Sequence, residues 1–290
     1  MGNSSTELPA MGTAATKPRL LVTTTTLPRF LGDPEPRFVL DLSKQLSKSF
    51  DVTVLAPADP QAALVERMEG LRVVRYRYAP LRAMEVIAYP GAIIDQLKQR
   101  PILWPLVPLL IDGLRRAVGR LLSTQDFDCV QAHWLIPQGA IQGLCFAGAD
   151  APPYIITCQG ADVYTNNGIL GRRSKQRALR NAAAITVVSK ALQGELTRQF
   201  GAENVSDKCH VAPMGVDLDL FRPDKRSAAW VDRHKLHRPV ILFVGRLAEK
   251  KGLKYLLQAL AQEPLKMTDA TLAVIGDGPM RGTLEALSQD

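Results

Sequence analysis

Residues 240–252 constrain the fold of this 290-residue chain more than any other stretch. They begin with five apolar residues, too few for a helix and rich in β-branched types, which predict a buried parallel strand. Gly245 and Arg246 predict a tight turn, and Lys251 precedes a glycine and a helix. Such a turn directs backbone N–H groups and the positive end of a helix to one place, where the two cations add charge. The stretch therefore predicts an α/β fold that binds a diphosphate; the alternative is two solvated cations beside an ordinary turn.

A second strand-and-helix unit follows the first. Its strand, residues 272–275, leads into Gly276 and Gly278, and both units continue into a helix with apolar residues on one face. Two parallel strands need further neighbours and helices on both faces of the sheet. Residues 239–290 are too few to complete such a layer, so the chain is expected to be truncated within its second domain.

The earlier part of the chain predicts a complete parallel α/β domain over residues 18–223. A polar leader, residues 1–17, is expected to be disordered, and a charged, helix-poor linker is expected at residues 224–238. Among the predicted strands, the run that alternates apolar and basic residues is expected at an edge of the sheet. The expected strands are residues 19–23, 51–55, 71–76 (the edge), 128–134, 154–157 and 183–188.

Two loops at the carboxyl ends of these strands hold candidate binding groups, because ligands of open α/β sheets bind at that edge. The loop after the first strand carries Gly32, with an ordinary surface loop as the alternative. The strand 128–134 delivers His133 to the same edge. A histidine in that place is either a functional group or a structural residue with satisfied hydrogen bonds.

A third segment at this edge follows the strand 154–157 and contains Gln159, Gly160 and Asp162. The glutamine amide can hydrogen-bond a sugar hydroxyl or a backbone group, although it cannot take or give a proton. The alternative is a turn with a helix cap, in which Asp162 is the N-cap residue.

Taken in order, Gly245-Arg246-Leu247, Lys251-Gly252 and Gly276-Asp277-Gly278-Pro279 resemble the nucleotide-sugar half of the family 4 (group 1) glycosyltransferases. Residues 132–139 and 215–217 resemble segments of that family's first domain. The resemblance implies a GT-B type of fold, with two Rossmann-like domains, of which the C-terminal one is incomplete here. It also implies transfer of a sugar from a nucleotide-diphosphate sugar to a glycan or lipid-linked acceptor, with retention of the anomeric configuration.

The resemblance also suggests roles for individual residues. In the family, the arginine and lysine at the positions of Arg246 and Lys251 grip the diphosphate of the donor. The candidate site residues are Gln159, Asp162 and His133 as catalytic groups, Arg246, Lys251 and Gly245 at the donor diphosphate, and Gly32, Gly160, Gly276 and Gly278 elsewhere in the cleft.

Gln159 departs from the family, whose members commonly carry His-Gly-x-Asp at this point. Retaining transfer is usually pictured with the departing phosphate helping to deprotonate the acceptor, so a missing histidine need not abolish it. Gln159 and the abrupt end of the chain favour an alternative, namely an inactive fragment or a non-catalytic subunit completed by a second polypeptide. An oxidoreductase with a dinucleotide fold is excluded, because no Gly-x-Gly-x-x-Gly follows the first strand.

The charge balance favours an anionic partner, because 36 basic and 28 acidic residues give a net charge of +8. Nucleic acid is not expected, since aromatic residues are only 6% and no basic cluster is interleaved with them. The four cysteines are scattered without a Cys-x-x-Cys pair, which predicts buried thiols in a reducing compartment and no metal site. We expect a cytoplasmic protein with no cofactor, for which the nucleotide sugar is a substrate.

Residues 98–122 interrupt the regular pattern with three prolines in their first half. Their apolar part is too short to span a bilayer, but Trp104 and neighbouring leucines beside Arg115 and Arg116 fit peripheral contact with the inner face of a membrane. The alternative is a pair of helices packed on the N-terminal sheet, and both interpretations hold together if the acceptor is lipid-linked.

Overall fold

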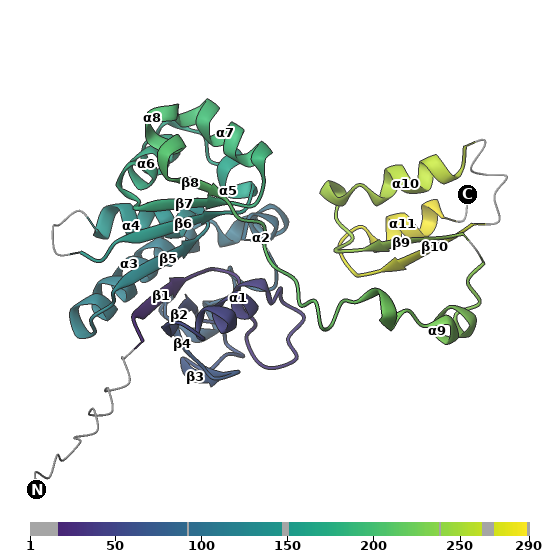
Figure 1. Cartoon of the computed structure of the whole chain (residues 1–290), viewed down its shortest axis with the longest axis horizontal. Helices are drawn as coiled ribbons and strands as arrows, with labels where there is room; N and C mark the ends of the chain where they lie inside the picture. Colours follow the sequence, from purple (N-terminus) through teal and green to yellow (C-terminus); the bar gives the residue numbers. More distant parts are fainter. Residues whose placement is uncertain (1–16, 92, 147–150, 238, 263–269, 289–290) are drawn as a thin grey trace, which may run out of the picture. The chain divides into compact units, whose positions relative to one another are not determined.

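The structure is a computed structural model that describes residues 17–91, 93–146, 151–237, 239–262 and 270–288 (Figure 1). Of the predicted leader, only Lys17 lies among the described residues. The contacts divide the chain into an N-terminal unit that ends at Gly215 and a C-terminal unit that begins at Val216.

The described residues of the N-terminal unit contain an eight-stranded sheet with the order β3-β4-β2-β1-β5-β6-β7-β8. All neighbouring strands are parallel except β3 and β4. All six predicted strands are confirmed, and β3 and β8 are additional. The bounds are β1 (Arg19–Thr23), β2 (Asp51–Pro57), β3 (Val65–Met68), β4 (Leu71–Tyr76), β5 (Cys129–His133), β6 (Tyr154–Cys158), β7 (Ala184–Val187) and β8 (Cys209–Val211).

The prediction that residues 71–76 form an edge strand is wrong. The short strand β3 pairs antiparallel with β4 and takes the edge position. Its sequence, Val-Glu-Arg-Met, carries two charges in four residues and so gives no apolar signal. Arg75 of β4, expected at a half-exposed edge, is 3% exposed, because its guanidinium donates to the carbonyl of Pro28 at 2.6 Å.

Helices cover both faces of this sheet (Figure 1). On one face, α1 packs over Leu20 and Val22 of β1; on the other, α3, α4, α6 and α7 enclose a larger core that includes Leu21. Successive residues of β1 thus enter opposite cores, as a strand buried on both faces requires. The helices are α1 (Phe38–Leu46), α2 (Ile93–Gln99), α3 (Leu106–Thr124), α4 (Ala140–Cys145), α5 (Ala161–Tyr164), α6 (Ile169–Asn181), α7 (Lys190–Phe200) and α8 (Ala202–Val205), with short turns η1 (Arg82–Met84), η2 (Pro101–Leu103), η3 (Leu135–Gly139) and η4 (Ser206–Lys208).

The strand order reverses at β1, which lies between β2 and β5. The chain therefore leaves β1 and β5 toward opposite sides, and the crevice at this switch point is the usual ligand site of an open α/β sheet. The loop after β1 and the segment after β5 border it. Of the pair of helices predicted over residues 98–122, α3 is confirmed, since its Leu110, Leu114 and Val118 belong to the core of this unit, whereas α2 ends already at Gln99.

The C-terminal unit contains β9 and β10, which are parallel, with α10 and α11 on one face. Both predicted strand-and-helix units are confirmed. The linker predicted to be helix-poor contains one short helix, α9, whose first turn is capped by the Ser227 hydroxyl. The elements are η5 (Pro223–Lys225), α9 (Ala228–Arg233), β9 (Val240–Val244), η6 (Glu249–Lys251), α10 (Leu253–Leu260), β10 (Thr271–Ile275) and α11 (Arg281–Leu287).

Candidate functional site

His133 and Gln159 meet at the carboxyl edge of the N-terminal sheet. His133 ends β5 with no exposed surface, and its Nδ1 lies 3.1 Å from Nε2 of Gln159. When the glutamine amide donates this hydrogen bond, the imidazole carries its proton on Nε2. Burial lowers the pKa of His133 to about 4. The imidazole is therefore neutral at pH 7, so it can position Gln159 without carrying a charge.

Asp162 connects the two loops that follow β5 and β6 through hydrogen bonds. Its carboxylate accepts the backbone N–H of Leu135 at 2.8 Å, that of Gly160 at 2.8 Å and that of Gln159 at 3.1 Å. Burial raises the pKa of Asp162, and these three hydrogen bonds oppose the rise. The N-cap of α5 is Gly160 rather than Asp162, with φ of +124° that favours glycine.

Lys175 is a buried cation beneath this segment. Its Nζ donates to the carbonyl of Val163 at 2.8 Å, to Oδ1 of Asn167 at 3.0 Å and to the carbonyl of Thr165. Burial lowers the pKa of Lys175, and the charge of Asp162 opposes that change. This lysine is not among the site residues predicted from the sequence. Its signal is a position on the buried face of α6, where Ala178 and Leu179 share that face.

The loop after β1 is held by buried charges. Asp33 accepts hydrogen bonds from the Arg29 guanidinium at 2.8 Å through each of its two oxygens, and these hold the pKa of Asp33 below its usual range. Arg75 fixes the same loop at Pro28. Gly32 is exposed with φ of +87°, so a turn accounts for this glycine.

Trp134 has an unusual backbone at the end of β5. Its φ is +82°, a conformation that bulky residues rarely adopt and that clusters at functional sites. Its ring packs edge-to-face on Phe38 at the start of α1, with 6.4 Å between centroids. Among the described residues the indole Nε1 has no hydrogen-bond partner. The aromatic pair thus joins the loops on both sides of the switch point.

In the C-terminal unit, the loops after β9 and β10 are bonded to each other. The N–H of Leu247 donates to the carbonyl of Asp277 at 2.9 Å, and the N–H of Met280 donates to the carbonyl of Leu247 at 3.0 Å. A Cβ on Gly276 would lie 1.9 Å from the carbonyl oxygen of Gly245, and one on Gly278 would lie 2.4 Å from that of Leu247. Both glycines therefore allow close backbone contact.

The two candidate cations lie on this paired loop. Arg246 is half-buried immediately after Gly245, and Lys251 is exposed at the end of η6. Gly252 follows in the left-handed conformation, with φ of +73°, and is the N-cap of α10. The backbone N–H groups at the start of α10 thus lie close in sequence to both cations, an arrangement suited to an anion.

Two stretches of the chain match patterns of known protein families. The pattern described as Glycosyltransferase Family 4 matches residues 36–220, more than half of the chain, and the pattern described as Glycosyl transferases group 1 matches residues 224–290. The chain belongs to glycosyltransferase family 4.

Curated relatives of this family 4 chain are glycosyltransferases of bacteria. The GDP-mannose-dependent alpha-(1-6)-phosphatidylinositol monomannoside mannosyltransferase of Mycolicibacterium smegmatis is 29% identical over 59% of this chain and 44% of its own length. The D-inositol 3-phosphate glycosyltransferase of Xylanimonas cellulosilytica is 25% identical over 87% of this chain and 60% of its own. The chain therefore spans less than two thirds of the length of these relatives.

The fold of the family 4 chain is shared with the crystal structure of Anabaena HepE in complex with UDP. The TM-score is 0.61, with 16% sequence identity over 93% of this chain and 65% of that one. At this identity the likeness concerns the fold alone. It confirms the predicted class, an α/β protein of GT-B type with Rossmann-like domains.

Each unit of the family 4 chain brings part of the predicted site together. His133, Gln159, Gly160 and Asp162 form one bonded cluster, and Gly245, Gly276 and Gly278 form one loop pair. Among the described residues, no group of three or more His, Cys, Asp or Glu side chains could hold a metal ion. The cysteines Cys129, Cys145, Cys158 and Cys209 are free thiols.

Proposed function

We propose that this chain transfers a sugar from a nucleotide-diphosphate sugar to a glycan or lipid-linked acceptor, with retention of configuration. The observation that carries the proposal is the loop pair of the C-terminal unit, where close backbone contacts hold the segment that carries Arg246 and Lys251 ahead of the start of α10. Membership of family 4 supports it. The matched relatives are named as transferases, two of their names include GDP-mannose or inositol phosphate, and a structure of similar fold contains UDP.

In this proposal the two cations stabilise the diphosphate as it departs. The bond from the anomeric carbon to the phosphate oxygen breaks, and its electron pair goes to the diphosphate. The acceptor oxygen then bonds to the anomeric carbon, and its proton passes to the departing phosphate. Fixed cations contribute most when charge develops near them, so they lower the barrier without a metal ion.

The buried cluster of the N-terminal unit is proposed to orient the acceptor side of the reaction. Gln159 cannot transfer a proton, but its amide, held by His133 and by the Asp162 turn, can hydrogen-bond a sugar hydroxyl. His133 has no exposed surface and a lowered pKa, so its proposed role is to position Gln159. Asp162 acts likewise by holding the backbone of Gln159 and Gly160 in place.

The test is a calorimetric titration of the full chain with UDP and with GDP. The double variant Arg246→Ala/Lys251→Ala is compared with Lys254→Ala, which removes an exposed cation from the adjoining helix. Loss of charged hydrogen bonds should weaken binding by roughly 10- to 100-fold in the double variant and leave the control unchanged. Equal binding by all three proteins would overturn the assignment of the diphosphate site. Binding without sugar transfer would favour the non-catalytic alternative.

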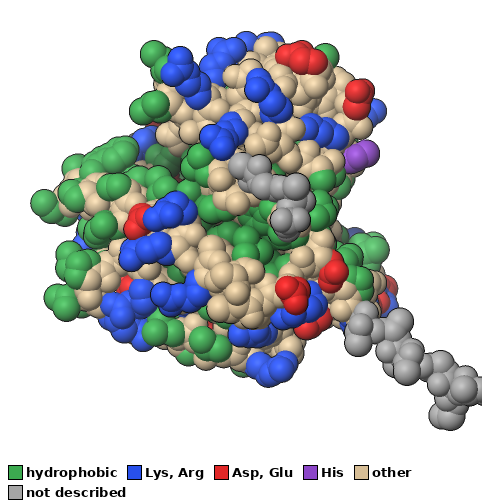
Figure 2. Space-filling view, turned by 90° about the vertical axis from the view of Figure 1, so that its left-hand side faces the viewer, with side chains coloured by type: hydrophobic (Ala, Val, Ile, Leu, Met, Phe, Trp, Pro, Cys, Tyr) green, Lys and Arg blue, Asp and Glu red, His purple; other side chains and the backbone are tan. Residues whose placement is uncertain are grey.

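We further propose peripheral membrane contact through residues 98–122. Ile102 is 83% exposed and Trp104 is 59% exposed, although their neighbours Leu103 and Leu106 are buried in the core. Hydrophobic side chains lie beside Lys and Arg on the face of the N-terminal unit drawn in Figure 2. An exposed tryptophan and isoleucine near cations fit the boundary of an anionic bilayer. In the described residues, no helix combines the length and apolar character needed to cross a membrane.

Vesicle flotation measures this contact directly. The double variant Ile102→Ser/Trp104→Ser should bind vesicles of phosphatidylglycerol and phosphatidylcholine roughly tenfold more weakly, because it removes two apolar anchors. The control is Tyr255→Ser, since Tyr255 is 69% exposed in the other unit. If the double variant binds the vesicles as strongly as the unaltered chain, the proposal of membrane contact is wrong.

A further inference from the structure

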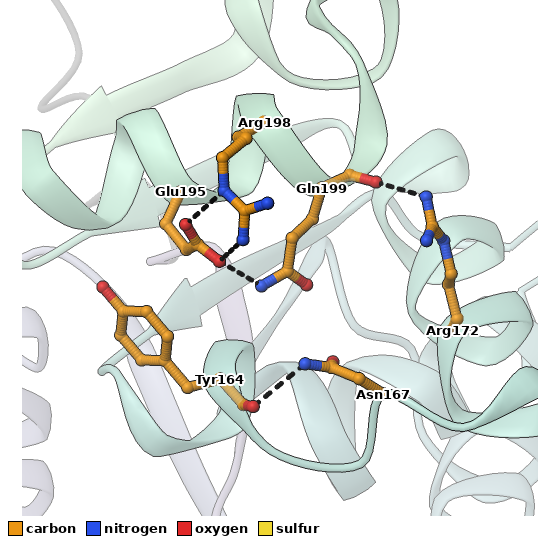
Figure 3. Close-up of a pocket in the computed structure, with 6 residues that line it drawn as sticks. All are labelled: Tyr164, Asn167, Arg172, Glu195, Arg198 and Gln199. Atoms are coloured by element: carbon orange, nitrogen blue, oxygen red, sulfur yellow. Dashed lines mark hydrogen bonds and ion pairs between the residues drawn. The ribbon is translucent and has the colours of Figure 1, made fainter.

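A cavity of about 490 Å³ lies in the N-terminal unit (Figure 3). Its walls come from the segment after α5, from the first turn of α6 and from α7. The lining residues are Tyr164, Asn167, Arg172, Glu195, Arg198 and Gln199. Tyr164 ends α5, the helix whose first turn contains Asp162, so the cavity adjoins the candidate acceptor side.

The polar groups of the cavity are held in place before any ligand binds. Asn167 accepts a hydrogen bond from the buried Lys175 at 3.0 Å and donates one to the carbonyl of Tyr164 at 3.0 Å. Arg172 donates to the carbonyl of Gln199 at 2.9 Å, which joins α6 to α7. Groups fixed in this way lose little conformational entropy when a ligand binds.

Glu195 and Arg198 form an ion pair in the cavity, and Arg172 adds one positive charge. Glu195 accepts hydrogen bonds from Nε of Arg198 at 2.8 Å and from Nη2 at 2.5 Å. Hydrogen bonds from Arg198 and then Gln199 lower the pKa of Glu195 to about 2, so the pair stays ionised. A phosphate would meet this carboxylate, whereas a neutral ligand with many hydroxyls meets both donors and acceptors.

Tyr164 supplies an aromatic surface beside these polar groups. The residue is 54% exposed, and its ring borders the cavity in Figure 3. A pyranose ring has one face of C–H groups that can pack on an aromatic ring, while its hydroxyls hydrogen-bond at the edge. The planar side chains of Glu195, Arg198 and Gln199 can exchange pairs of hydrogen bonds with neighbouring hydroxyls.

We propose that this cavity is a subsite for a neutral pyranose ring of the acceptor, so that the acceptor of the proposed transfer is a glycan or a glycosylated molecule. The inference rests on the proposed transfer function. Tyr164 stacks on the sugar, and the Glu195–Arg198 pair binds its hydroxyls. The link to the reaction is short, since only Val163 lies in the sequence between Asp162, which holds Gln159, and Tyr164 beside the cavity.

Saturation-transfer NMR on the full chain tests this subsite with methyl α-D-mannopyranoside and methyl α-D-glucopyranoside as probes. At least one glycoside should show transfer to its C–H protons, and Tyr164→Ala should weaken its binding about tenfold. Tyr164→Phe keeps the ring and should retain binding, and the exposed Tyr255→Ala is the surface control. No transfer to either glycoside, or equal binding by Tyr164→Ala, would overturn the proposal.

Two further arms separate the possible failures. Orthophosphate is titrated in competition with the glycoside, and displacement at equal affinity would overturn the assignment to a neutral sugar. UDP and GDP are titrated into the same samples. If a nucleotide binds and neither glycoside does, the subsite is wrong while the proposed function stands. If a glycoside binds in a Tyr164-dependent way and neither nucleotide does, the subsite stands and the proposed function falls.

Discussion

In the N-terminal unit the candidate groups are buried and bonded to one another, whereas in the C-terminal unit the loop pair is closed by backbone contacts and carries an exposed candidate cation, Lys251. His133, Asp162 and Lys175 are each at most 6% exposed. Lys251, by contrast, is exposed, and the contacts that shape its loop are those of Gly276 and Gly278. In the N-terminal unit the candidate binding residues are therefore also the residues that stabilise the fold. In the C-terminal unit the candidate cation and the residues that shape its loop are different.

The difference shows which substitutions can be interpreted. In the N-terminal unit, a change at a candidate residue removes a buried hydrogen bond, so its effect on function comes with an effect on folding. In the C-terminal unit, under the proposed function, a change at an exposed cation should alter binding while the loop pair remains intact. Lysines occur in both settings and offer the sharpest contrast.

The substitution Lys175→Met should give the largest effect. It leaves the carbonyl of Val163 and Oδ1 of Asn167 without their donor and removes the positive charge near Asp162. We expect the free energy of unfolding to fall by roughly 3–5 kcal/mol, measured by urea titration. The matched variant Lys251→Met should change it by less than about 0.5 kcal/mol. Similar changes in the free energy of unfolding for the two variants would contradict the contrast between the two units.

A pH dependence of folding should follow from His133. Its pKa is lowered from 6.5 to about 4, so between these values the unfolded chain binds a proton that the folded chain does not. Stability is therefore complete above pH 6.5 and falls as the pH decreases toward 4, by about 3 kcal/mol in all. Urea midpoints between pH 4 and pH 7 measure the slope.

Two variants separate the contribution of His133 to the pH dependence of stability from that of carboxylates that titrate in the same pH range. His133→Gln should lose the part of the slope that comes from the imidazole, and His210→Gln, at an exposed position, should keep it. An NMR titration of the unaltered chain gives the pKa directly. A value for His133 near 6.5 would contradict its burial.

Apolar runs were enough to predict most of the sheet, because strands buried on both faces have a clear pattern. The run 71–76 is predicted at the edge because it alternates apolar and basic residues. The true edge strand β3 is not predicted because it is short and charged, and no local signal shows that Glu66 and Arg67 belong to a strand. Arg75 was expected in solvent for the same reason. Its burial depends on the Pro28 carbonyl, 47 residues away in the sequence.

The candidate site was predictable as motifs but not as contacts. Gly276 and Gly278 are predicted from the sequence to line a cleft. The structure gives a second reason why these positions need glycine, since a side chain there would collide with the backbone of the loop after β9. Lys175 gave no functional signal, since a lysine in a basic helix is normally solvated. Only the packing of α6 turns this side chain toward Val163 and Asn167.

The substitution Gly276→Ala tests whether backbone contact alone shapes the loop pair of the C-terminal unit, and it should give the smallest of the three stability effects. The new Cβ would lie 1.9 Å from the carbonyl oxygen of Gly245, and φ is +150°, so the loops must separate at a cost of about 1–3 kcal/mol. Hydrogen exchange should then accelerate at the amides of Leu247 and Met280, and UDP or GDP affinity should fall. Gly282→Ala, with open space around it, should leave both unchanged. Unaltered exchange in Gly276→Ala would mean that the side chains, as in the N-terminal unit, hold this loop together.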